Sequence, residues 1–213
     1  MIEIFKEKVI KFIDSFYITQ GVNNNVDFEL KLKKGKHSEA DYIYVLKYVI
    51  DYIIQENAII IPNQTISFNS WVLKFVYSKD NFLEIHELDP TNLVGCIEGA
   101  EFSLEIQKNQ IKVCEKYSSK FVFPIINQKI VISDGVLEGN PVEAIRYESP
   151  KHMSGWWITT DLYNDDINSL KQIELPELNS KRPDLIQYLA LDNGYRFFID
   201  RDIEDVWLDE TIE

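Results

Sequence analysis

Apolar residues in the first segment of the chain recur at the spacing of an amphipathic helix. Three or four residues separate most of the apolar positions, and lysines fall between them. The apolar members of this pattern are Ile2, Phe5, Val9, Phe12, Ile13 and Phe16. A stripe of this period is typical of a helix with one face on a core. The pattern therefore predicts an N-terminal helix that ends near Gly21.

Two further elements are predicted before residue 57. Apolar and charged residues alternate in VDFELKLKK, residues 26–34, which indicates a half-buried strand. A helix is predicted to begin at Ser38, because this serine and Asp41, three residues later, match a capping box. The apolar stripe of this helix continues to Ile54.

Residues 58–88 change to short β-branched and aromatic runs separated by PNQ, NS and SKDN. Such runs predict a small antiparallel sheet against which the two helices pack. Residues 97–117 fit both a helical period and an alternating one, and we prefer the helix.

A second β-rich section begins at Lys129. KIVIS, PVEAIRYES and SGWWITTD predict three strands, a short helix starts at Pro183, and YRFFID and EDVWLDE predict closing strands. The expected fold class is α+β, with N-terminal helices packed on a small antiparallel sheet, followed by a second β-rich α+β section. The domain boundaries are placed at 1–117 and 118–213, and the two parts fold separately or pack as one unit.

The adjacent tryptophans of SGWWITTD point to opposite faces if this segment is a strand. Ile158 shares the face of Trp156, and Thr159 shares the face of Trp157. The pattern therefore predicts that Trp156 lies in the core. Trp157 is expected on the opposite face, covered either by a partner or by a second layer of this protein.

The composition indicates a globular protein that is acidic in its C-terminal part. Of its 213 residues, 45% are hydrophobic, and the net charge is −13. Asp and Glu outnumber Lys and Arg by 18 to 7 in residues 134–213, but only by 17 to 15 in residues 1–133. This field repels a phosphate backbone and attracts a basic protein. We therefore expect no nucleic-acid partner.

Charged residues also interrupt the segments that export or membrane insertion requires. The first 16 residues mix charges throughout, unlike a secretory signal. The most apolar stretch, residues 43–61, contains Lys47 and Asp51. We expect a cytoplasmic protein with no membrane role, in which Cys96 and Cys114 stay reduced.

Sequence patterns for metal, nucleotide or nucleophile chemistry are missing. The three histidines fall in separate segments without HExxH spacing, and the sequence contains no glycine-rich phosphate loop. The acidic turn that begins at Asp161 fails the calcium-loop pattern, because Asp166 and Gln172 stand where glycine and glutamate are required. We predict no metal, no cofactor and no catalytic residue.

The strip that runs from Trp157 into this acidic turn is the predicted partner-binding site. Its members are Trp157, Thr159, Asp161, Tyr163, Asp165 and Asp166. A partly exposed tryptophan is a common interface anchor, and acidic residues suit a basic partner. Arg146 and Arg182 are further candidates, because an arginine among acids orients a carboxylate bidentately. Internal ion pairing is the alternative role for both arginines.

Four segments resemble the C-terminal domain of bacterial immunity-protein-like families, which accompany toxins of polymorphic and contact-dependent systems. They are AIRYESPKHMSGWWITTDLYNDDINSL, KRPDLIQYLAL, GYRFF and VWLD. The resemblance covers about residues 128–210 and is most specific in SGWW and RPDL. It implies a cytoplasmic, non-catalytic protein that binds and neutralises a toxin, and it supplies no residue roles.

Two other functions are compatible with the sequence. A hydrolase would use His152, near Ser149 and Ser154, or His86 with neighbouring carboxylates. A scaffold protein would use exposed aromatic residues to form a homo-oligomer. The binding module is preferred, because both the acidic C-terminal part and the resemblance favour it.

Overall fold

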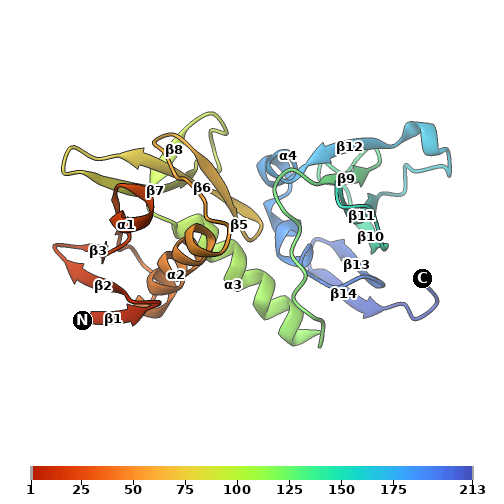
Figure 1. Cartoon of the computed structure of the whole chain (residues 1–213). Coiled ribbons are helices and arrows are strands. Elements are labelled where there is room, and N and C mark those ends of the chain that lie inside the picture. The colour runs from red at the N-terminus through yellow and green to blue at the C-terminus, as the bar shows by residue number, and fades with distance from the viewer. Residues whose placement is uncertain (1, 213) are drawn as a thin grey trace. The chain divides into compact units, whose positions relative to one another are not determined.

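The computed structural model describes residues 2–212 and divides the chain into two compact units, Met1–Glu105 and Ile106–Glu213. Each unit contains one β-sheet with its own helices (Figure 1). Helix α3 (Glu101–Lys116) contributes its first residues to one unit and the remainder to the other. The division between the two units therefore falls within the residues of α3.

The N-terminal unit is an eight-stranded sheet in the order β1-β2-β3-β4-β7-β6-β5, with β8 beside β7. Its strands are β1 (Ile2–Phe5), β2 (Lys8–Ile13), β3 (Phe16–Gln20), β4 (Glu29–Lys33), β5 (Thr65–Phe68), β6 (Trp71–Tyr77), β7 (Phe82–Leu88) and β8 (Cys96–Glu98). Helix α1 (Asn23–Val26) is one turn long, and α2 (Glu39–Gln55) buries its apolar stripe in the core of this unit.

The helix predicted for the first 16 residues is wrong, because this segment forms β1, β2 and the start of β3. Two-residue turns join these strands, and all four turn residues have positive φ: Lys6, Glu7, Asp14 and Ser15. Positive φ at both central residues is the geometry of the tight hairpin turn that matches strand twist. The helix-like spacing arose because these turns interrupt an alternating pattern at regular intervals.

Other N-terminal predictions are confirmed. The Ser38 backbone N–H donates to the Asp41 carboxylate at 2.8 Å, as a capping box requires at the start of α2. Strands β5, β6 and β7 pair antiparallel, as predicted for residues 58–88. The strand predicted from residue 26 begins only at Glu29, because α1 ends at Val26 and is followed by Asp27, whose φ is 65°.

The C-terminal unit is a six-stranded sheet in the order β12-β9-β11-β10-β13-β14. Its elements are β9 (Lys129–Ile132), β10 (Val142–Arg146), β11 (Met153–Thr159), the 3-10 helix η1 (Ile167–Ser169), β12 (Lys171–Glu174), α4 (Leu175–Lys181), the 3-10 helix η2 (Pro183–Tyr188), β13 (Tyr195–Asp200) and β14 (Ile203–Leu208). The five strands predicted here and the helix preferred for residues 97–117 are confirmed. β12 and α4 were not predicted, since each is only one short run of residues.

The fold class is therefore α+β, as predicted, but the chain begins with strands instead of a helix. No helix within residues 2–212 combines the length and apolar character needed to cross a membrane.

Candidate functional site

Gly155 sets the direction of the two tryptophans on β11. Its φ is +85°, and the pairing of β11 with β9 shifts register between Met153 and Trp157, as at a β-bulge. A Cβ at this position would collide with the carbonyl oxygen of Tyr147, so only glycine fits. Beyond the bulge, Trp156 is 0% exposed, whereas Trp157 is partly exposed. The prediction that Trp156 lies in the core is confirmed.

Trp156 lies on the inward face of the sheet, where it is enclosed by other parts of the C-terminal unit. Its indole Nε1 donates to the carbonyl oxygen of Leu189 at 2.8 Å, directly after η2. Its ring packs against Phe197 of β13, with the centroids 5.1 Å apart. This face therefore belongs to the core.

Arg146 also lies on the inward face and is 5% exposed. Its guanidinium donates to four backbone carbonyl oxygens, those of Val122, Ser154, Leu189 and Leu191. Burial lowers the pKa of this guanidinium to about 10. Arg146 ties the segments before β9 and after η2 to the sheet from inside the unit.

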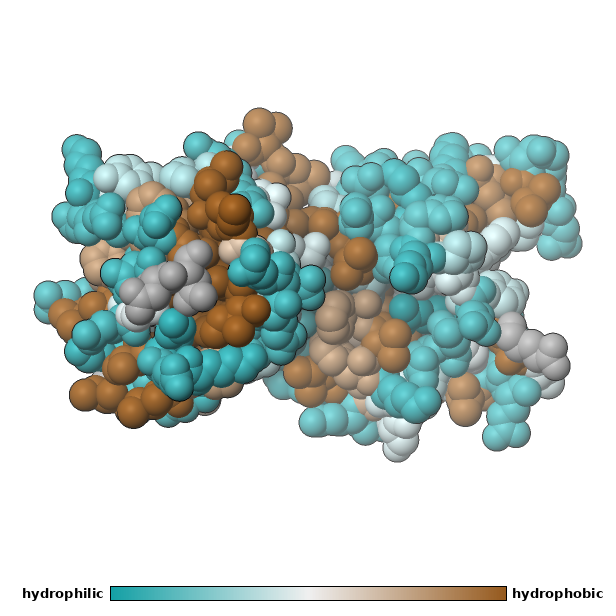
Figure 2. Space-filling model, in the orientation of Figure 1, coloured by the Kyte–Doolittle hydropathy of each residue, from teal (hydrophilic) through white to brown (hydrophobic). Residues whose placement is uncertain are grey.

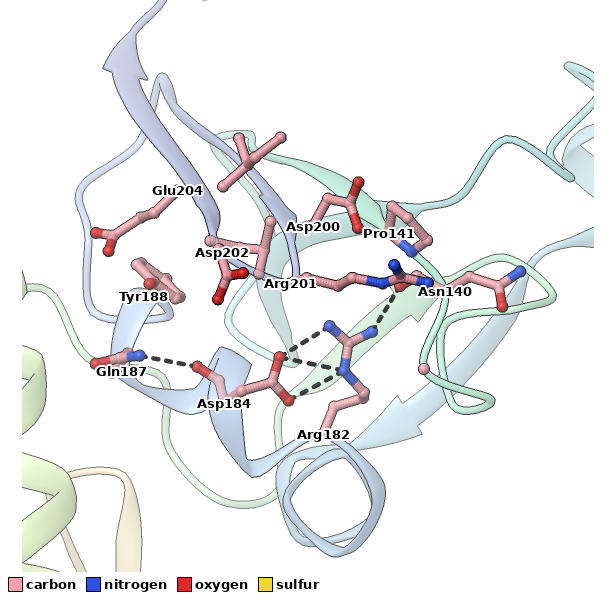
Figure 3. Close-up of a pocket in the computed structure, with 13 residues that line it drawn as sticks. Asn140, Pro141, Arg182, Asp184, Gln187, Tyr188, Asp200, Arg201, Asp202 and Glu204 are labelled. Carbon is pink, nitrogen blue, oxygen red and sulfur yellow. Dashed lines mark hydrogen bonds and ion pairs between the residues drawn. The ribbon is translucent and has the colours of Figure 1, made fainter.

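Arg182 is 7% exposed and forms one wall of a hollow of about 760 Å³ (Figure 3). Its Nε and Nη2 donate to the Asp184 carboxylate at 3.0 and 2.8 Å, and its Nη1 donates to the carbonyl oxygens of Val136 and Asn140. This is the internal ion pair considered above as the alternative role. Both arginines are therefore occupied within the unit.

Strand pairing aligns one residue from each of the six strands across the opposite, outward face of the sheet. This outward row consists of Gln172, Val131, Trp157, Ile145, Arg196 and Trp207. Val131 is buried, and the other five side chains keep part of their surface accessible. The row therefore presents two tryptophans and one arginine to the surroundings.

Trp157 separates two hollows on the outward face. The larger, of about 500 Å³, is also lined by Tyr147, Tyr163 and Asp165. The smaller, of about 190 Å³, is mainly apolar and includes Ile167. The Tyr147 ring stands edge-on to the Trp157 indole, with centroids 6.1 Å apart and planes at 84°. Trp157 is thus accessible from two sides.

The loop between β11 and β12 carries the predicted acidic residues. Tyr163 and Asp165 line the larger hollow with Trp157 and Thr159, whereas Asp161 and Asp166 are exposed outside it. The Asp166 carboxylate accepts a bond from the Asn168 backbone N–H at 2.9 Å and so caps η1. Figure 2 shows apolar side chains on this loop at the upper right, where large hydrophobic residues are exposed.

Arg196 has its charge balanced on the outward face. Its Nη2 lies 3.0 Å from the Glu143 carboxylate, its Nη1 lies 2.9 Å from Asp209, and its guanidinium lies 5.9 Å from the Trp207 ring centroid. The strip predicted from the sequence does not include Arg196, Tyr147, Ile145 or Trp207. Each lies on or beside a correctly predicted strand, but only the pairing of the strands places it on the same side of the sheet as Trp157.

Neither of the histidines considered for a hydrolase lines the two hollows beside Trp157. His86 Nε2 is 3.5 Å from Glu84, and its Nδ1 is 4.0 Å from Cys96 Sγ on the N-terminal sheet. Glu84 also accepts a bond from Lys31 at 3.0 Å, so this group belongs to an ion-pair network. His152 is exposed before β11. Over residues 2–212, no group of three or more His, Cys, Asp and Glu side chains is arranged to hold a metal ion.

Comparison with known proteins relates the C-terminal unit to one family. Residues 109–209 match the family model described as the Imm33-like domain, and the match covers less than half of the chain. It extends from α3 to the end of β14 and supports the resemblance to immunity-protein families proposed for residues 128–210. No curated protein and no solved structure shows significant similarity to the chain.

Proposed function

We propose that the protein is a non-catalytic immunity protein that binds a toxin in the cytoplasm and neutralises it. The match of residues 109–209 to the Imm33-like domain carries this proposal, because the family name denotes immunity proteins. Immunity by direct inhibition requires a surface that holds another protein, and a protein partner is what the family implies. The outward face of the C-terminal sheet is the surface that fits this task best.

Two properties favour the outward face. Its row holds Trp157 and Trp207, which are partly exposed, and tryptophan and arginine are enriched among the residues that dominate binding energy. The neighbouring loop contributes exposed acids, and the C-terminal part has an excess of negative charge. Complementary charge accelerates association, so the partner surface is basic. Arg146 and Arg182 are left out of this surface, because both are buried.

The proposal is tested by co-expressing the full chain with the toxin encoded beside it. We expect co-purification and protection of growth, and we expect Trp157→Arg to abolish both while leaving the fold intact. Tyr77→Ala is the matched control, since Tyr77 is an exposed aromatic residue of the N-terminal unit. Absence of both complex and protection with the wild type would contradict the function. Full protection by Trp157→Arg would contradict the proposed surface.

A further inference from the structure

The larger hollow beside Trp157 combines aromatic walls with carboxylates. Tyr147, Trp157 and Tyr163 supply the aromatic rings, and Glu143 and Asp165 supply the carboxylates. Tyr147 and Trp157 meet at nearly a right angle, which forms a corner of two ring surfaces. Aromatic faces attract cations electrostatically, and a nearby carboxylate adds an ion pair.

We infer that this hollow receives an arginine side chain of the bound protein, an inference that rests on the proposed function. A guanidinium is planar, stacks on aromatic rings and pairs with a carboxylate through two parallel N–H bonds. The volume of about 500 Å³ is ample for one such group. The outward face already holds one arginine in such surroundings, because the Arg196 guanidinium lies near both the Glu143 carboxylate and the Trp207 ring.

The charges around the hollow also favour a cation. Arg196 does not repel an incoming guanidinium strongly, since Glu143 and Asp209 both pair with it. Asp165 is exposed, and no other residue in the described chain, 2–212, forms a hydrogen bond or ion pair with its carboxylate. Asp161 and Asp166 lie on the same loop and add negative potential. Asp165 is therefore the carboxylate that is available to the partner.

Hydrogen bonds on either side of Asp165 order the backbone at the rim of the hollow. The Tyr163 N–H donates to the Thr160 carbonyl oxygen at 3.1 Å, and the Asp166 N–H donates to Asn164 Oδ1 at 3.2 Å. Between these bonds Asp165 adopts a φ of 65°. A loop backbone that is already ordered loses less entropy on binding.

The inference is tested without the toxin, by titrating the ¹⁵N-labelled full chain with N-acetyl-L-arginine methylamide. We expect a saturable shift of the Trp157 indole N–H signal, which Trp157→Phe identifies by its loss. One cation–π contact and one exposed ion pair correspond to a dissociation constant of about 10 mM, which rises with salt. The neutral citrulline analogue has the same shape and is expected to cause no saturable shift.

Asp165→Asn and Asp161→Asn form a matched pair that removes the same charge inside and outside the hollow. Asn tolerates positive φ, so Asp165→Asn keeps the turn. We expect Asp165→Asn to weaken binding of the arginine analogue by about fivefold and Asp161→Asn by less than about twofold. Equal effects of both variants, equal shifts with citrulline, or no shift with the arginine analogue would each overturn the inference.

The inference about the hollow and the proposed function can fail independently of each other. If the wild type neutralises the toxin but the arginine analogue leaves the Trp157 signal unchanged, the inference fails and the proposed function stands. If the analogue binds but no toxin is neutralised, the proposed function fails and cation binding by the hollow stands.

Discussion

The two faces of the C-terminal sheet use the same residue types for different purposes. On the inward face Arg146 lies 5.9 Å from the Trp156 ring centroid, and on the outward face Arg196 lies 5.9 Å from that of Trp207. The inward arginine donates to backbone carbonyls, whereas the outward arginine pairs with carboxylates. The inward pair is enclosed and stabilises the unit. The outward pair keeps accessible surface, which is what a binding face requires.

Replacing the adjacent tryptophans separates the two faces most strongly. Trp156→Ala leaves a large cavity in the core and is expected to lower the unfolding free energy of the C-terminal unit by about 3–5 kcal/mol. Trp157→Ala is expected to lower it by only about 1–2 kcal/mol, because part of this side chain is already in water. Urea unfolding of each variant measures the difference. Equal losses would mean that both faces are core.

The two arginines give a second test of the same contrast. Arg146→Met leaves buried carbonyl oxygens, including those of Leu189 and Leu191, without a donor, at an expected cost of about 3 kcal/mol. Arg196→Met removes partly exposed ion pairs and is expected to cost less than about 1 kcal/mol. Urea unfolding of both variants measures the difference in unfolding free energy. A larger loss for Arg196→Met would reverse the assignment of the faces.

Gly155 keeps the two faces distinct, and Gly139 supplies its control. Both have positive φ, +85° and +91°, but a Cβ at Gly155 meets the Tyr147 carbonyl, whereas a Cβ at Gly139 meets nothing within 4 Å. Gly139→Ala is expected to cost only the backbone strain, about 1–2 kcal/mol. Gly155→Ala should cost at least about 1 kcal/mol more, because β10 and β11 must also separate locally. Equal decreases in Tm for the two variants would show that the close approach of Gly155 to the Tyr147 carbonyl oxygen does not affect stability.

The local features of the inward face were predictable from the sequence. Alternation places Ile158 and Trp156 on one face of a strand, and burial of the apolar face follows from the hydrophobic effect. The N-terminal hairpins were missed for a related reason. The spacing of their apolar residues fits a helical period as well as strands joined by short turns. Only the turn residues with positive φ, such as Asp14 and Ser15, distinguish the hairpins from a helix.

The outward row could not be predicted, because it depends on register between strands that are distant in sequence. Gln172 reaches Val131, and Arg196 reaches Ile145, only through pairings that the alternating pattern leaves undetermined. The strip along β11 supplied Trp157, Thr159, Tyr163 and Asp165, which do meet at one hollow. The residues on the other strands required the structure.

The smallest expected effect is a pH dependence at the margin of the inward face, where Glu204 of β14 meets the end of α3. Burial raises the pKa of the Glu204 carboxyl, but hydrogen bonds from the Tyr117 hydroxyl at 2.7 Å and the Lys116 ammonium at 3.0 Å outweigh it. The pKa therefore lies below its ordinary value in the folded unit. A carboxyl with a lowered folded pKa stabilises the fold above its unfolded pKa, and this contribution is lost as the pH falls through the folded pKa.

Glu204→Gln removes this contribution, so the stability of the variant should fall less than that of the wild type as the pH is lowered through the carboxylate range. Urea midpoints of the wild type and Glu204→Gln, measured across acidic pH, test this expectation. An unchanged slope of stability against pH in Glu204→Gln would show that the contact of Glu204 with the end of α3 does not contribute to the acid sensitivity of the fold.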